Sequence, residues 1–118
     1  MELITEAQYA QLLANGIADR DAARVGLTFD PKPVVKLYTP HSCFRWLLSE
    51  IHPVFAHRAY GLCDPGDGRP HMGLVDLRDL EDVHGRIKFT VVADPRFVAD
   101  KPISAYAEVA YARGLIVT

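Results

Sequence analysis

Cysteine is scarce in this chain, and long apolar runs are missing from it. Two cysteines, Cys43 and Cys63, occur among 118 residues, too few for the disulfide framework of a small secreted domain. No apolar run approaches the roughly 20 residues that cross a bilayer as a helix. Residues 1–4 have neither the basic start nor the long apolar segment of a signal peptide. We therefore expect a reduced, cytoplasmic protein with no membrane association.

An excess of positive charge is also missing. The chain has 13 Lys and Arg residues against 15 Asp and Glu residues, and its formal net charge is −2. Nucleic-acid-binding domains carry a basic patch or stripe, because phosphate contacts supply much of their affinity. Aromatic residues can stack single-stranded bases, but Trp46, Tyr60 and Tyr106 lie at strand and helix-stripe positions that are typical of a core. We expect no nucleic-acid partner.

Sequence motifs for metals, phosphates and dinucleotides are absent as well. Structural zinc sites need closely spaced Cys or His pairs. The nearest approach, His41-x-Cys43, lacks the third group that would orient a catalytic cysteine. The loop 64–73 is rich in glycine and proline, but it has no phosphate-loop or dinucleotide pattern and too few oxygen ligands for calcium. We expect no metal and no cofactor, and we interpret the loop as a hairpin connection.

The chain does have enough apolar residues for a core. Hydrophobic residues make up 49% of it and charged residues 24%, as in ordinary globular domains. A chain of this length favours one domain, residues 1–118, that folds without disulfides or metals. It has no internal repeat and no low-complexity tract that would indicate another organisation.

The middle of the chain organises the predicted fold, because four apolar, β-rich runs follow one another there. Residues that favour turns separate the runs, so an antiparallel meander is the most direct interpretation. The run 44–51 could also form a short helix, but the alternation of Phe44, Trp46 and Leu48 favours a strand. Gly61 indicates a bulge or a close backbone approach. Strands are expected at residues 34–39, 44–51, 58–63, 72–75 and 87–92.

Helices are predicted on both sides of this meander. Thr5 and Gln8 form a capping box that begins a helix, and Asn15-Gly16 is expected to end it. Residues 17–30 carry many charges and are expected to form a solvated connection, which could include a short helical turn around residues 21–24. Two further helices are expected, from Asp76 to a stop at Gly85 and from Pro102 to a stop at Gly114.

These elements predict an α+β fold class. We expect a single domain with a four- to five-stranded, mainly antiparallel sheet. The N- and C-terminal helices are expected to pack on one face of the sheet, because each carries an apolar stripe that must be buried. The other face is then left partly open.

Several phrases of the sequence, taken together, resemble a known family of short bacterial proteins. The phrases are PVVKLYTP at 33–40, WLLSE at 46–50, YGLCD at 60–64, GLVDL at 73–77 and FVADKPISAYAE at 97–108. They resemble domain-of-unknown-function family 2958 over nearly the whole chain. This family is encoded largely on plasmids, integrative elements and prophages, often near anti-restriction and conjugation genes. The resemblance therefore implies an accessory role in horizontal transfer or in countering host defence, and it supplies no catalytic residues.

Polar residues embedded in the apolar strands are the candidate binding site. Some of the residues Lys36, Arg45, Glu50 and Asp64 would share a face if the strands pair as a meander. A partly dry group of this kind has perturbed pKa values and can hold a ligand. His71 lies beside the glycine-rich loop, and loops on a rigid sheet often carry binding residues. The competing interpretation is a solvated face, where exposed ion pairs stabilise by only about 0–1 kcal/mol.

The lack of a catalytic pattern and the family resemblance together indicate a binding protein. We predict a non-enzymatic accessory protein of a mobile genetic element. It would bind a partner protein with an open sheet face or edge, in a role that could counter a host defence system. The alternative is a small enzyme or ligand-binding protein built on Lys36, Glu50 and Asp64, with His41 or His71 beside them. No catalytic residue is predicted, and a homo-oligomer stays possible.

Overall fold

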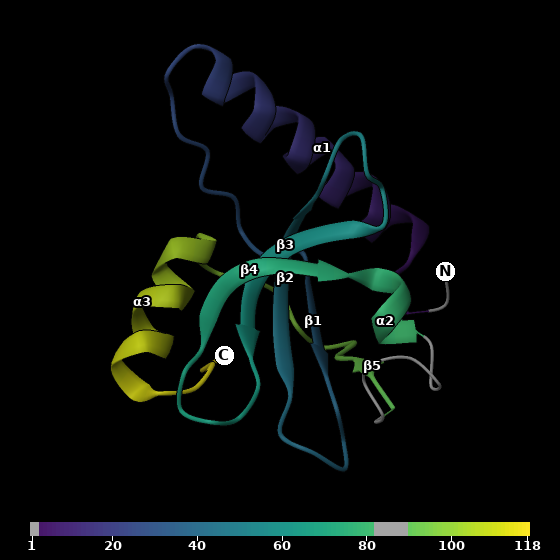
Figure 1. Ribbon diagram of the computed structural model, residues 1–118, viewed down its shortest axis with the longest axis vertical. Coiled ribbons are helices and arrows are strands. Elements are labelled where there is room, and N and C mark those ends of the chain that lie inside the picture. Colours follow the sequence, from purple (N-terminus) through teal and green to yellow (C-terminus); the bar gives the residue numbers. More distant parts are fainter. Residues whose placement is uncertain (1–2, 82–89) are drawn as a thin grey trace.

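Antiparallel strands form one sheet in the computed structural model, which describes residues 3–81 and 90–118 (Figure 1). The strands are β1 (Val35–Tyr38), β2 (Arg45–Ile51), β3 (Arg58–Asp64), β4 (His71–Asp76) and β5 (Val92–Ala93), and the helices are α1 (Glu6–Arg24), α2 (Leu77–Glu81) and α3 (Ile103–Arg113). The sheet order is β4-β3-β2-β1-β5. The first four strands form the predicted meander, and β5 pairs with the outer edge of β1. The predicted α+β class is therefore confirmed.

The tryptophan-bearing segment is a strand, as its alternation predicted. β2 pairs with β1 in an antiparallel ladder that places Val35 opposite Leu48. Trp46 is buried, and its ring stacks on Phe44 with the ring centroids 5.8 Å apart. The helical alternative for residues 44–51 is excluded by this ladder.

Helix α1 begins where predicted but runs on to Arg24. The capping box is present: Gln8 N donates to Thr5 Oγ1 over 3.1 Å, and Thr5 N donates to Gln8 Oε1 over 3.0 Å. The prediction that Asn15-Gly16 ends the helix is wrong. Both residues are buried in the helix interior, where they face the sheet, so the tertiary contact overrides their local preference for a helix stop.

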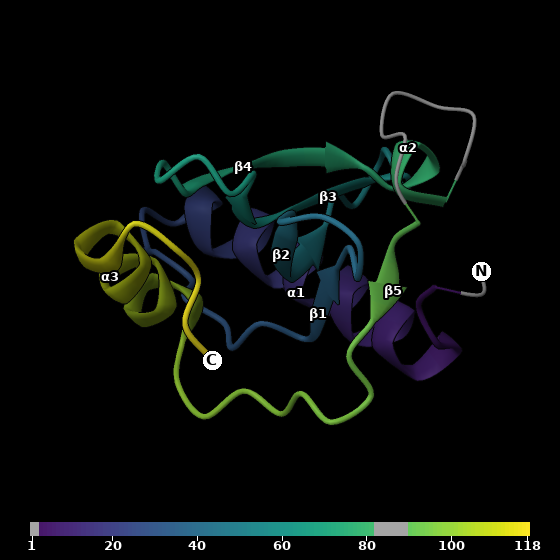
Figure 2. The ribbon, with the colours of Figure 1, turned by 90° about the horizontal axis from the view of Figure 1, so that it is seen from below.

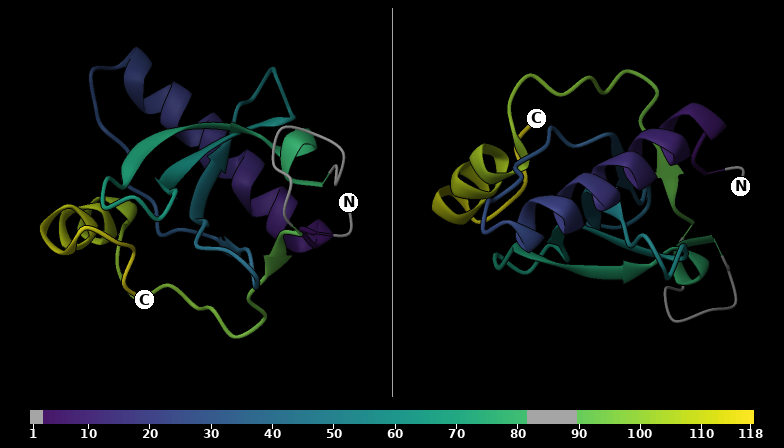
Figure 3. Two further views of the ribbon diagram at one scale, coloured as in Figure 1. Left: turned by 60° about the horizontal axis from the view of Figure 1, so that its bottom comes forward. Right: turned by 90° about the horizontal axis from the view of Figure 1, so that it is seen from above.

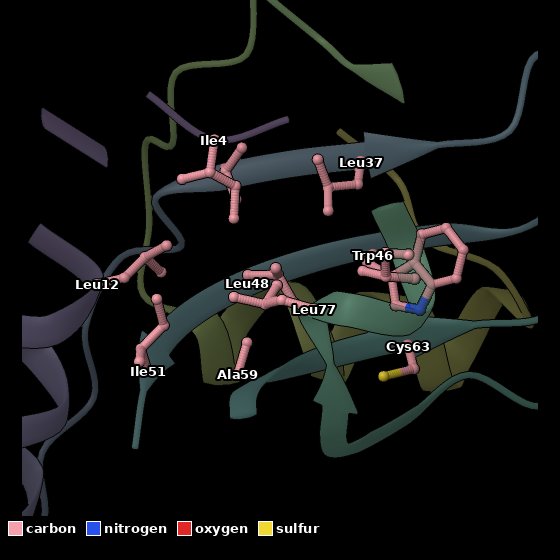
Figure 4. Close-up of a cluster of buried hydrophobic side chains, with 11 residues drawn as sticks. Ile4, Leu12, Leu37, Trp46, Leu48, Ile51, Ala59, Cys63 and Leu77 are labelled. Carbon is pink, nitrogen blue, oxygen red and sulfur yellow. The ribbon is translucent and has the colours of Figure 1, made fainter. Parts of the chain in front are cut away.

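Each terminal helix covers a different face of the sheet. Neighbouring residues of a strand point to opposite faces, and Leu47 and Leu48 of β2 are both fully buried. Leu48 packs in the cluster that contains Leu12 of α1 (Figure 4), whereas Leu47 packs in a cluster with Ala107 of α3. The expectation that both helices share one face is wrong in this detail, because the meander has apolar residues on both faces. Figures 2 and 3 show α1 running diagonally past the strands and α3 lying beside them.

The start of α2 and the end of α3 match the capping residues seen in the sequence. Arg78 N donates to Asp76 Oδ1 over 2.9 Å at the start of α2. α3 follows Pro102 and ends at Gly114, whose φ of 78° is the left-handed conformation that glycine tolerates. Within residues 3–81 and 90–118, no helix combines the length and the apolarity that crossing a membrane requires.

The chain after α3 packs against the sheet without adding a strand. Ile116 is buried in the cluster of Leu47 and α3. The stop at Gly85 and most of the predicted strand 87–92 lie outside the described residues. The described part of that region forms β5, whose two residues pair with Leu37 and Tyr38.

Candidate functional site

Lys36, the first of the predicted site residues, lies on β1 and contacts the end of the chain. Its Nζ donates to Thr118 Oγ1 over 2.7 Å and lies 4.0 Å from Asp94 Oδ2. These contacts connect β1 to the segments beyond β5 and α3. Lys36 does not line the groove that contains Glu50.

Asp64 is buried at the end of β3, and its carboxylate accepts hydrogen bonds from backbone N–H groups. Its side chain is 1% exposed. Oδ1 accepts a hydrogen bond from Gly66 N over 2.8 Å, and Oδ2 accepts one from Ile116 N over 2.9 Å. Asp64 therefore ties the glycine-rich loop to the C-terminal segment, with both carboxylate oxygens already occupied.

Arg45 and His71 lie at the same end of the sheet as Asp64. Arg45 is directly opposite Asp64 in the β2–β3 ladder. His71 begins the edge strand β4, is exposed, and has Nδ1 3.3 Å from the Arg69 carbonyl oxygen. The structure thus groups Arg45, Asp64 and His71 loosely at this end and separates Glu50 from them along the strands.

Glu50 lines a groove of about 580 Å³ on the sheet face that α3 partly covers. We call it the Glu50 groove. Its walls are the second half of α1, the segment 27–31 that follows α1, the turn 52–54 and Ile103 at the start of α3. Its floor is a row of cross-strand neighbours, in which Glu50 is opposite Tyr60 and Tyr60 is opposite Leu74. The floor is uncovered because α3 packs over the next row of the sheet, which contains Leu62.

β2 is irregular immediately before Glu50. Its pairing with β3 shifts between Leu48 and Glu50, which is a bulge that leaves Ser49 unpaired in the ladder. Ser49 is buried, its Oγ donates to the Tyr60 carbonyl oxygen over 3.2 Å, and its own carbonyl oxygen accepts from Asn15 Nδ2 over 2.9 Å. The Asn15 side chain on α1 therefore supplies a hydrogen-bond donor for the Ser49 carbonyl group in the bulge. The bulge also places Glu50 on the same face of the sheet as Tyr60.

Gly16 allows α1 to pass close to the end of β2. A Cβ atom at this position would lie 1.8 Å from the carbonyl oxygen of Ile51 and 3.0 Å from its carbonyl carbon. Asp19 follows three residues later, on the same side of the helix. The close approach at Gly16 thereby brings the Asp19 carboxyl group to that of Glu50.

Asp19 and Glu50 form an acid pair in the groove. Partial burial, then the charge of Asp19 and a hydrogen bond between the two carboxyl groups, raise the pKa of Glu50 from 4.5 to about 7. Burial, followed by the charge of Glu50, also raises the pKa of Tyr60. A carboxyl group that lies beside a second carboxyl group and is partly buried keeps its proton to higher pH. Glu50 therefore exchanges its proton near neutral pH.

The rim of the groove exposes large apolar side chains. Leu27 is 65% exposed, Val54 69% and Leu74 62%. The turn that carries Val54 is held by His52, whose Nδ1 accepts hydrogen bonds from Val54 N over 3.1 Å and Phe55 N over 3.0 Å. The imidazole of His52 thus stabilises the turn 52–54. The rim presents an apolar surface around the acid pair.

No basic side chain neutralises the acid pair in residues 3–81 and 90–118. Arg20 lines the groove, but its Nε lies 3.7 Å from Asp21 Oδ1. Among the described residues, neither Asp19 nor Glu50 has a Lys or Arg nitrogen within 4.0 Å. The same part of the chain also contains no group of three His, Cys, Asp or Glu side chains placed to hold a metal ion.

Sequence reasoning found Glu50 but missed Asp19 and the floor position of Tyr60. Asp19 falls in the segment that the sequence predicts to be a solvated connection, because Asn15-Gly16 has the local character of a helix stop. A usable signal was present: Leu12, Gly16, Asp19 and Ala23 recur at helical spacing, which places the aspartate on the face that packs on the sheet.

Replacing Glu50 with glutamine is expected to stabilise the chain at alkaline pH but not at acidic pH. The folded chain holds the Glu50 proton more tightly than the unfolded chain, so stability falls as the pH rises from 4.5 through about 7. Glutamine cannot ionise and keeps the shape of the protonated acid. Because Glu50 is half-exposed and solvent screens it, we expect a gain of only about 1 kcal/mol at high pH.

The measurement is urea unfolding of E50Q and the parent chain at about pH 5 and about pH 8. Asp21→Asn is the matched control, because it removes an exposed carboxylate from the same helix and should show no such dependence on pH. Equal effects of E50Q at both pH values would contradict the acid pair.

Comparisons with known proteins find a family model that covers almost the whole chain. The model described as "Protein of unknown function (DUF2958)" matches residues 3–117. No curated protein and no solved structure matches the chain. The matched region includes both the floor and the walls of the Glu50 groove.

Proposed function

Given that the chain belongs to the family described as "Protein of unknown function (DUF2958)", we propose that it is a non-enzymatic binding protein that docks on a partner protein through the Glu50 groove. One observation carries this proposal: the fold leaves large apolar side chains exposed around an open groove. Leu27, Val54 and Leu74 come from three separate segments and are each more than half exposed. Exposed apolar side chains gathered around a groove with polar groups are typical of an interaction site.

The position of the groove at the edge of the sheet adds support. β4 is an edge strand, and Leu74 at its centre forms one end of the groove floor. Tyr60 and Tyr111 are also exposed. After burial and the charge of Glu50, Tyr111 is the next cause that raises the pKa of Tyr60, so the two tyrosines lie near each other. Tyrosine and leucine surfaces of this kind supply binding energy when a partner removes them from water.

The family resemblance supports a biological setting for the binding. The resemblance implies a family encoded largely on plasmids, integrative elements and prophages. In that setting the chain is an accessory protein of a mobile genetic element, and its partner is a host protein or a protein of the element. Binding that occupies a host defence protein would protect the element from that defence.

The second candidate is a small enzyme or ligand-binding protein, and the acid pair is the observation that favours it. A carboxyl group with a pKa of about 7 can act as a general acid or base at neutral pH. The set Lys36, Glu50 and Asp64 does not serve this role, because Glu50 alone of the three lines the groove. The exposed apolar side chains around the acid pair favour binding over catalysis.

Leu74→Asp is expected to weaken partner binding strongly, because it places a charge at the apolar end of the groove floor. Val98→Asp is the matched control: Val98 is 85% exposed and does not line the Glu50 groove. Each chain is used for affinity capture from host cells with quantitative mass spectrometry, and each captured partner is then titrated in purified form. We expect at least about tenfold weaker binding for Leu74→Asp and less than about twofold for Val98→Asp.

Circular dichroism and size-exclusion chromatography of the same three chains report folding and self-association. A partner that binds the Leu74→Asp chain as tightly as the parent chain would contradict the proposal. A small molecule retained by the purified chain, with no partner protein whose binding depends on Leu74, would favour the second candidate.

A further inference from the structure

The Glu50 groove combines apolar walls with an acid pair that no basic residue of the described chain neutralises. On the premise of the proposed docking, we infer that the groove takes an apolar segment of the partner that carries one lysine or arginine. The ammonium or guanidinium group of this residue lies against Asp19 and Glu50. The inference specifies the chemistry of the partner, which the proposed function leaves open.

Charge complementarity is the first support. The ionisable groups that face the acid pair are Tyr60 on the floor and, at the rim, His52 and Arg20. Tyr60 is a neutral phenol, and His52 uses Nδ1 to hold the turn 52–54. Arg20 has its nearest described carboxylate partner in Asp21. Among the described residues, no Lys or Arg nitrogen lies within 4.0 Å of Asp19 or Glu50, and a segment with a basic side chain would supply that partner.

The apolar lining of the groove favours a positive charge on a long side chain with an aliphatic stem. Lysine and arginine carry aliphatic stems that pack on apolar surface while the charged head reaches a polar group. Leu27, Val54 and Leu74 would contact such a stem and its apolar neighbours, and the exposed face of Tyr60 can also attract a cation. A free metal ion fits less well, because two carboxylates supply too few of the six or more oxygen ligands that calcium prefers.

A wholly apolar segment would also fit less well. It would remove water from Asp19 and Glu50 without giving them a partner, and a buried polar group without a partner is unfavourable. A basic side chain instead stabilises the ionised form of Glu50, so its arrival displaces the proton of Glu50. Binding is therefore expected to release protons near pH 7, where Glu50 is still partly protonated.

Selection of short random peptides displayed on phage tests the inference with a defined probe. The full chain, the isosteric double variant Asp19→Asn/Glu50→Gln and Leu74→Asp are used as baits. Peptides enriched by the parent chain but not by Leu74→Asp are expected to share one Lys or Arg among apolar residues. In synthetic peptides, changing this residue to Gln should weaken binding to the parent chain about tenfold or more, and to the double variant less than about twofold.

Calorimetry of the best peptide in two buffers with different ionisation enthalpies measures the released protons. We expect release with the parent chain at about pH 7 and none with the double variant. Peptides that need Leu74 but lack a basic residue, or a basic residue equally important to both chains, would overturn the inference and leave the proposed docking intact. Enrichment of no peptide dependent on Leu74 would overturn both. A dimer of the chain that Leu74→Asp dissociates would assign the groove to a second copy and overturn the inference as well.

Discussion

Replacing Gly16 with alanine is expected to lower the free energy of unfolding by about 3 kcal/mol, although alanine is the better helix former. The added Cβ would lie 1.8 Å from the Ile51 carbonyl oxygen, so α1 or the end of β2 must move. The neighbouring bond from Asn15 Nδ2 to the Ser49 carbonyl oxygen, 2.9 Å long, would be strained or lost. The same movement would take Asp19 away from Glu50.

Two measurements separate this effect from helix propensity. Ala14→Gly, at an exposed position of the same helix, should destabilise the chain by about 1 kcal/mol through propensity alone. Propensity by itself would make Gly16→Ala stabilising by a similar amount. Carbon NMR of the Glu50 carboxyl group should show its pKa falling from about 7 toward 4.5 in Gly16→Ala. A more stable Gly16→Ala chain with an unchanged Glu50 pKa would contradict the close approach of α1 to β2.

The meander could be predicted because the residues that determine it are close together in the sequence. Alternating apolar residues and turn residues recur along β1 to β4, and each strand pairs with its neighbour in sequence. The role of Gly61 was also readable: a Cβ there would lie 2.0 Å from the Leu47 carbonyl oxygen, which is the close backbone approach that a strand glycine suggests.

The acid pair could not be predicted because it depends on contacts between distant segments. Asn15-Gly16 has the local character of a helix stop, and its actual use becomes evident only against the end of β2. The bulge at Ser49 likewise decides which face Glu50 occupies, since a shift of one residue reverses the face of every side chain that follows. Glu50 was thus identified as a candidate by its type and position, whereas its partner Asp19 required the packed structure.

The sheet face that each terminal helix covers also could not be predicted from the sequence. Both helices have apolar stripes, and a stripe alone does not reveal which face of a sheet it will cover. The burial of Leu47 and Leu48 on opposite faces of β2 requires cover on both sides. This division also creates the Glu50 groove, because α3 covers one part of its face and α1 reaches the same face from the end of β2.

Asp64→Ala is expected to destabilise the chain by about 3 kcal/mol, because it leaves two backbone N–H groups without their charged acceptor. Gly66 N and Ile116 N both donate to this buried carboxylate. The loss would free the C-terminal segment, so Ile116 should leave the cluster that it forms with Leu47 and α3. A melting temperature about 10 °C lower is the corresponding thermal result.

Asp67→Ala is the matched control for this change. Asp67 lies in the same loop and accepts one hydrogen bond from Arg69 N over 3.0 Å, but it is exposed, so its loss should change stability by less than about 0.5 kcal/mol. Hydrogen exchange of the Ile116 amide should accelerate in Asp64→Ala and stay unchanged in Asp67→Ala. An Asp64→Ala chain with the parent's stability and weaker partner binding would instead make Asp64 a ligand-binding residue, as the sequence suggested. Because both of its oxygens already accept backbone hydrogen bonds, we expect the loss of stability, and we expect partner binding to depend on Glu50 and Leu74.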